Sequence, residues 1–216
     1  MDAAFWHQMW HSGQVGFHQS DINQFLQKEW QQLGLQGQET VLVPLCGKTL
    51  DMLWLKQLGH SVVGVELSEA ALQSFLETHQ LTGTPTSHPH FCGYEVAGLT
   101  LYCGDFFHLS ATDCQSIGAV YDRAALIALP EAMRQDYVAH LKSILPQTQP
   151  QLLIAMEYDS TRLSGPPFSV SQSEIEQLYA PQYRIHPLQS IAFERKGVPT
   201  TETAYWLEPI APTTSK

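Results

Sequence analysis

The chain has 216 residues, of which 44% are hydrophobic and 15% are charged, a composition that supports a sizeable core and excludes a disordered chain. Its formal net charge of −10, from 11 basic and 21 acidic residues, argues against nucleic acid or an anionic membrane as a partner. Four cysteines without a CxxC pair favour reduced structural thiols and the cytoplasm.

The first 35 residues predict a helical cap that belongs to no strand pattern. They offer two helices, which we expect to pack across one end of the fold, with Trp30 on the second, outer helix. Trp6 and Trp10 lie one turn apart on the first helix, a spacing more typical of core packing than of ligand contact. Glycines within the block 5–18 would let the chain turn across a pocket, so this block is interpreted as a lid.

Strand-like and helix-like patterns alternate along the middle of the chain. Apolar, β-branched runs indicate strands at 41–43, 61–65, 117–121 and 151–156. Helical patterns lie between and after them, at about 49–58, 68–78 and 130–144. This alternation is typical of βαβ units, which build a mostly parallel, doubly wound sheet.

Antiparallel strands are predicted beside the parallel ones. The segment "FCGYEVAGLTLYCGDFF" (91–107) alternates around Ala97 and Gly98, which favours a hairpin. In the last third, "QYRIHPLQSIAF" and "TETAYWLEPI" flank the polar break "ERKGVPT" and predict two strands at an antiparallel sheet edge. Residues 211–216 predict a flexible tail, and the whole chain, 1–216, is expected to be a single α/β domain.

The turn "PLCGK" (44–48) follows the first strand, where ligands bind in open α/β sheets. Gly47 would let the backbone pass close to a ligand, and the next helix would begin with its free N–H groups aimed at the same space. Glu66 closes the second strand nineteen residues after Gly47, close to the interval at which an acid accepts hydrogen bonds from ribose hydroxyls. The spacing therefore predicts a nucleoside, or else an ordinary strand–turn–helix with a solvated Glu66.

The composition of this turn limits the classes of ligand that it could bind. A dinucleotide's pyrophosphate needs several glycines, and here Pro44, Leu45 and Cys46 take those places. A nucleoside without a phosphate fits better, and S-adenosylmethionine is the common one. A nicotinamide-dependent oxidoreductase is thereby disfavoured, and a non-catalytic nucleotide-binding module stays as an alternative.

Several blocks of the sequence also resemble a known family. They are "FWHQMWHSGQVGFHQSDIN", "VLVPLCGKTLDMLWLKQLGHSVVGVELSE", "YCGDFF", "VYDRAALIALP" and "GPPFSV", in order from residue 5 to about residue 175. Together they are similar to the thiopurine S-methyltransferase family in its bacterial form. The resemblance implies a Rossmann-like class I methyltransferase fold and methyl transfer from S-adenosylmethionine to the sulfur of aromatic and heterocyclic thiols.

The resemblance also implies the residues that contact the cofactor, which in this sequence are Trp10, Leu45, Glu66, Asp105, Phe106 and Arg123. Asp105 would accept from the adenine amino group, while Phe106 would lie against the ring. Arg123 is assigned to catalysis as well, by orienting an acceptor thiolate. Alternatives from the residues alone are that Asp105 caps a turn and that Arg123 forms a structural ion pair.

Other candidate motifs contribute little. Histidine pairs at 7 and 11 and at 88 and 90 have no further metal-binding partner at a suitable spacing, so we expect no metal site. The double proline in "RLSGPPFSV" (162–170) predicts a stiff loop near the active site, with a cis bond as one option. We expect a monomer that acts on a small-molecule thiol, or on a selenium or tellurium compound.

Overall fold

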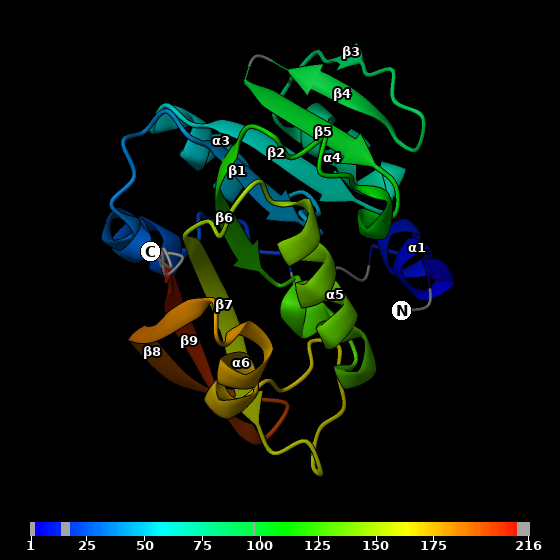
Figure 1. The fold of residues 1–216 in the computed structure, drawn as a ribbon. Coiled ribbons are helices and arrows are strands. Elements are labelled where there is room, and N and C mark those ends of the chain that lie inside the picture. Colours follow the sequence, from blue (N-terminus) through cyan, green and yellow to red (C-terminus); the bar gives the residue numbers. More distant parts are fainter. Residues whose placement is uncertain (1–2, 14–17, 97, 211–216) are drawn as a thin grey trace, which may run out of the picture.

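The computed structural model describes residues 3–13, 18–96 and 98–210. The strands of these residues form one nine-stranded sheet in the order β3-β4-β5-β2-β1-β6-β7-β9-β8 (Figure 1). Its parallel centre consists of β1 (Thr40–Pro44), β2 (Ser61–Glu66), β5 (Leu99–Cys103), β6 (Ile117–Arg123) and β7 (Gln151–Tyr158). The chain runs outward from β1 to β2 and β5 and then returns to β6 on the other side of β1. Strand order therefore reverses between β1 and β6, which is where an open α/β sheet binds its ligand.

Helices cover both faces of the sheet, as the alternating pattern predicts. The helices α3 (Asp51–Gln57) and α4 (Glu69–Thr78) pack on one face, and α5 (Glu131–Ile144) and α6 (Gln172–Tyr179) pack on the other. Strand β1 shows why its valines and leucine suit this position. Val41 and Val43 belong to the hydrophobic cluster that includes α3 and α4, and Leu42 belongs to the cluster that includes α5 and α6, because successive side chains of a strand point to opposite faces.

Both outer parts of the sheet are antiparallel. The predicted hairpin is present as β4 (Cys92–Val96) and β5, with the two-residue strand β3 (Thr84–Pro85) beside it. The long strands β8 (Tyr183–Arg195) and β9 (Val198–Pro209) form the other edge, with β9 paired to β7. Residue 97 of the hairpin turn and the proposed tail 211–216 lie outside the described residues.

The N-terminal region divides into two parts. Helix α1 (Ala3–His11) has no buried residue and lies at the carboxyl ends of the central strands (Figure 1). Helix α2 (Gln24–Glu29) and the 3₁₀ helix η1 (Trp30–Leu33) instead pack into the core, and Asn23 caps α2 by accepting from the backbone N–H groups of its first turn. Residues 14–17 of the proposed lid are outside the described residues.

The expectation that Trp30 lies on an outer helix is wrong. Its side chain is 3% exposed, and its Nε1 donates to His60 Nε2 at 3.0 Å. The Trp30 ring also meets the Tyr121 ring edge to face, with 6.2 Å between centroids. The long-range partners His60 and Tyr121, which the local helical pattern does not reveal, draw this segment into the core.

Among the described residues, no helix has the length and apolar character needed to cross a membrane.

Candidate active site

A cavity lies at the carboxyl ends of β1, β2 and β6, at the reversal of strand order. Its walls also include α1, the loop after β5, the first half of α5 and the double proline. All seven site residues expected from the sequence line it together, namely Trp10, Leu45, Gly47, Glu66, Asp105, Phe106 and Arg123. Segments from five separate parts of the chain thus converge on one space.

The turn after β1 brings the backbone close to α1. Leu45 and Gly47 both have positive φ, at 48° and 54°. A Cβ added at Gly47 would lie 3.1 Å from Cζ2 of Trp10, so both the backbone conformation and the space favour glycine here. Trp10 therefore lies directly over the turn, which differs from the core packing suggested by its spacing alone.

Glu66 is buried at the end of β2 and binds two backbone groups. Its Oε2 accepts from Gly47 N at 2.9 Å, and its Oε1 accepts from Ser68 N at 2.8 Å. Burial raises the pKa of the Glu66 carboxyl above its ordinary value, and these backbone hydrogen bonds oppose the rise. Each carboxylate oxygen keeps a further lone pair, so the group can still accept from ligand hydroxyls. The alternative of a solvated strand end is wrong, because Glu66 is only 6% exposed.

Asp105 and Phe106 follow β5. Asp105 caps the 3₁₀ helix η2 (Phe106–His108) by accepting from Phe107 N at 3.0 Å, as the turn-capping alternative proposed. Phe106 is 5% exposed, and its ring packs against Tyr137 with 5.2 Å between centroids. Because both residues also line the cavity, the cap and the packing hold them beside the space that a ligand would occupy.

Basic side chains gather on another part of the cavity lining. Lys48 and His18 lie there with Arg123, and Lys48 Nζ donates to Ser74 Oγ at 3.2 Å. Burial lowers the pKa of His18, and the nearby charges of Lys48 and Arg123 lower it further, which favours the neutral imidazole. The combination suits an anionic group on the ligand or acceptor. Sequence reasoning missed His18 and Lys48, although both stand in quoted blocks, "GFHQ" and "LCGK".

Arg123 also faces an acid of the antiparallel edge. Burial raises the pKa of the Glu202 carboxyl on β9, and the positive charge of Arg123 opposes that rise. This supports the ion-pair alternative for Arg123 in part, since the protein itself balances some of its charge. Arg123 nevertheless lines the cavity, where its guanidinium can also meet a ligand.

Two fully buried acids hold tyrosine side chains that line the cavity. Asp51 accepts from Tyr121 OH and from Asn23 N, both at 2.8 Å. Asp122 accepts from Tyr137 OH at 2.8 Å, and burial raises its pKa to about 6. Because Tyr121 and Tyr137 line the cavity, these acids hold its aromatic wall. Two features of the sequence could have identified these acids. Asp122 directly follows the apolar run that ends in "VY", and Asp51 stands at the start of the helical segment "DMLWL".

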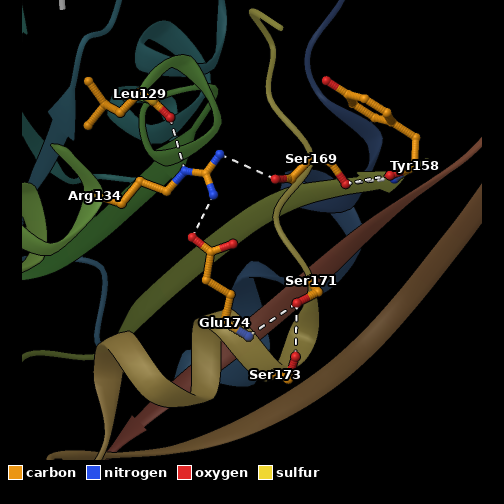
Figure 2. Close-up of polar contacts among 7 residues, drawn as sticks. All are labelled: Leu129, Arg134, Tyr158, Ser169, Ser171, Ser173 and Glu174. Atoms are coloured by element: carbon orange, nitrogen blue, oxygen red, sulfur yellow. Dashed lines mark hydrogen bonds and ion pairs between the residues drawn. The ribbon is translucent and has the colours of Figure 1, made fainter. Parts of the chain in front are cut away.

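The double-proline loop is held by Arg134 of α5 (Figure 2). The guanidinium of Arg134 donates to Leu129 O at 2.9 Å and to Ser169 O at 3.2 Å, and it pairs with the carboxylate of Glu174. Ser169 in turn donates to Tyr158 O at 2.8 Å. These contacts tie the loop to β7, α5 and α6 at once, which fixes the position of the loop.

The prolines themselves face the cavity. Pro166 and Pro167 line it, and the peptide bonds that precede both are cis. Tyr158 OH donates to Pro167 O at 2.7 Å, and Arg195 donates to Pro166 O at 3.2 Å. The prediction of a stiff loop near the site is consistent with these contacts.

One histidine of each pair has a hydrogen-bonding partner. His11 Nδ1 lies 2.7 Å from His7 O, and His88 Nε2 lies 3.0 Å from Asp113 Oδ1. Within the described ranges, no three side chains of the metal-binding types gather at one point.

A doubly wound sheet with an antiparallel edge, a buried acid at the end of β2 and a glycine-containing turn after β1 are the features of a class I methyltransferase. Solved structures share the fold: a SAM-dependent methyltransferase from Anabaena variabilis has a TM-score of 0.66 and 16% identity, over 95% of this chain and 94% of that one. A 1,6-didemethyltoxoflavin-N1-methyltransferase from Burkholderia thailandensis, solved with S-adenosylhomocysteine, has a TM-score of 0.62 and 14% identity, over 95% and 87%.

Sequence comparisons identify the family. The thiopurine S-methyltransferase family model matches residues 1–203. A thiopurine S-methyltransferase of Pseudomonas fluorescens is 47% identical over 88% of this chain and 87% of its own length. One from Shewanella baltica is 46% identical over 96% of this chain and 99% of its own length. The chain belongs to the thiopurine S-methyltransferase family and is a methyltransferase that acts on sulfur, which confirms the resemblance and leaves an oxidoreductase without support.

Proposed function

We propose that this cavity transfers the methyl group of S-adenosylmethionine to the sulfur of an aromatic or heterocyclic thiol. The observation that carries the proposal is the buried Glu66 carboxylate, joined to Gly47 N across the cavity floor in a member of this family. We propose further that the whole chain is one methyltransferase domain and that it acts as a monomer in the cytoplasm. The free state of all four cysteines supports that compartment.

The residues present fit the methyl donor. The Glu66 oxygens would accept from its two ribose hydroxyls, and Asp105 would accept from its adenine amino group. Phe106 would lie along the adenine ring, and Leu45 and Trp10 would enclose the turn beside it. Bound S-adenosylmethionine supplies an electrophilic methyl group on a sulfonium. Arg123 and Lys48 provide the positive charge for its carboxylate end.

The same walls favour an acceptor that is already ionised. A heterocyclic thiol loses its proton near neutral pH, so the cavity needs no strong general base. Arg123 would orient the thiolate, and the apolar side chains of Met9, Pro166 and Pro167 would exclude water from it. Because the charges of a thiolate and a sulfonium cancel as the bond forms, a dry cavity favours the reaction. Selenium and tellurium nucleophiles are soft like sulfur and are proposed as further acceptors.

The proposal predicts a preference for thiols. Calorimetry should detect S-adenosylmethionine binding, and a radiolabelled methyl-transfer screen should then favour thiols over phenols and amines of the same shape. The rate should follow the ionisation of the acceptor, since the proposed mechanism uses an acceptor that has already lost its proton. Equal turnover of a thiol and its phenol analogue would contradict the mechanism. Binding of S-adenosylmethionine with no transfer to any acceptor would support the non-catalytic alternative.

Substitution of Arg123 tests its catalytic role. Arg123→Lys keeps the charge but loses the planar, forked geometry, so turnover is expected to fall by about tenfold or more. Steady-state kinetics with saturating S-adenosylmethionine measures this. Arg162→Lys serves as the control, because Arg162 is exposed and donates to Gly197 O away from the cavity. Unchanged turnover in Arg123→Lys would reduce Arg123 to a structural partner of Glu202.

A further inference from the structure

Two cysteines face each other across the β4–β5 hairpin. Cys92 begins β4 and Cys103 ends β5, and the two are direct partners in the antiparallel register. Direct partners point to the same face of a sheet, with Cβ atoms about 4.5 to 5.5 Å apart. Cys92 is exposed, whereas Cys103 is 8% exposed. An external reagent can therefore reach the thiol of Cys92, whereas the thiol of Cys103 is largely covered.

The Cys92 thiol is in contact with the backbone of its register partner. Cys92 Sγ lies 3.7 Å from Cys103 O. Burial raises the pKa of Cys103 to about 12, and the charge of Cys92 and a hydrogen bond between the two thiols contribute to the rise. A disulfide needs Cα atoms about 4.4 to 6.8 Å apart and Cβ atoms about 3.5 to 4.5 Å apart. Opposed strand residues already meet the first condition and reach the second after a movement of about 1 Å.

Cys103 is also joined to the proposed cofactor site. It pairs with Glu66 in the register of β2 and β5, and its Sγ lies 3.9 Å from Leu67 O. The next residue, Gly104, donates from its N–H to Glu66 O at 2.9 Å. Leu67 and the segment 104–107 line the cavity. A movement of Cys103 toward Cys92 would therefore displace the wall that holds Asp105 and Phe106.

We propose that Cys92 and Cys103 form a reversible disulfide that weakens cofactor binding. The oxidant is a low-molecular-weight disulfide such as oxidised glutathione. The Cys92 thiolate attacks one of its sulfurs, an S–S bond forms on Cys92, and one glutathione leaves as a thiolate. Cys103 then gives up its proton to solvent and attacks the Cys92 sulfur, and the second glutathione leaves. The two cysteines lose two electrons in total, and one glutathione disulfide becomes two thiols.

The first step places the leaving group beside Cys103. Glutathione on Cys92 is bonded to the sulfur of the residue that faces Cys103 across the register, so the second attack needs no further encounter with the oxidant. Cys46 and Cys114 are fully or nearly buried and are not register partners of this pair, so the exposed Cys92 is the point of entry among the described cysteines.

The test uses the full chain with oxidised glutathione. Peptide mapping without reduction should find a Cys92–Cys103 link, and calorimetry should show about tenfold weaker S-adenosylmethionine binding, restored by dithiothreitol. A tenfold change in Kd corresponds to about 1.4 kcal/mol, which is the size of one weakened hydrogen bond to the ligand. Cys92→Ser should keep full affinity under oxidant. Cys114→Ala, which leaves the pair intact, should respond as the unmodified chain does.

Each other outcome overturns part of the proposal. Glutathione that stays on Cys92 without a second step would exclude the disulfide. A mapped disulfide with unchanged affinity would exclude the coupling to the cavity. The coupling depends on the proposed function, so failure of the reduced chain to bind S-adenosylmethionine would refute that function, while the mapping would still decide whether the pair closes.

Discussion

Glu66→Gln is expected to weaken S-adenosylmethionine binding by about 1.5 to 3 kcal/mol, roughly 10- to 150-fold in Kd. The carboxylate would make charge-assisted hydrogen bonds to the ligand, and the amide loses that charge. One side of the amide would also present an NH₂ group to Gly47 N or Ser68 N, both of which now donate to Glu66. The turn beneath the ligand would loosen as the ligand contact weakens.

Calorimetry on the folded variant measures this effect. Glu69→Gln is a matched control three residues further on, since Glu69 begins α4 and accepts from Gln73 on the surface. Its affinity should equal that of the unmodified chain. An unchanged Kd in Glu66→Gln, with circular dichroism showing a native fold, would remove Glu66 from the cofactor site.

Asp51→Ala is expected to lower the free energy of unfolding by about 3 kcal/mol or more. The change leaves Tyr121 OH and Asn23 N without their acceptor inside the core, and each unsatisfied donor costs about 1 to 3 kcal/mol. Asp51 also stands in the first turn of α3, where a negative charge stabilises the helix.

Urea unfolding followed by tryptophan fluorescence measures this loss. Asp136→Ala is the control, because Asp136 is exposed on α5 and should change stability by no more than about 0.5 kcal/mol. If the two variants unfold at the same urea concentration, Asp51 does not link the N-terminal segment to the core.

The sheet could be predicted because its signals are local. The continuous valine-rich runs of β1 and β2 indicate strands that are buried on both faces of a sheet. The helices between them are indicated by the spacing of their apolar residues. The place of η1 could not be predicted in this way. Trp30 owes its burial to His60, thirty residues away, and to the still more distant Tyr121. A helical pattern contains no information about such partners.

The residues of the site also differ in whether their roles could be predicted from local sequence. Gly47 and Glu66 follow from a turn and an interval in the sequence, and the structure brings them into contact. The role of Asp51 depends on Tyr121, seventy residues further along the chain. The part played by Arg134 depends likewise on a loop that meets it only in the folded chain. A residue that acts through a distant partner has no local signature.

Helix α1 gives the cavity two unlike sides. The Pro166 and Pro167 side is fastened by side chains from β7 and β8, whereas α1 buries no residue of its own and turns Phe5, Trp6, Met9 and Trp10 toward the cavity. A bound molecule would add apolar contacts to α1, and departure of the product would require those contacts to break. The same aromatic contacts that strengthen capture would also slow release, so we expect an acceptor with a larger apolar surface to gain affinity at the expense of turnover.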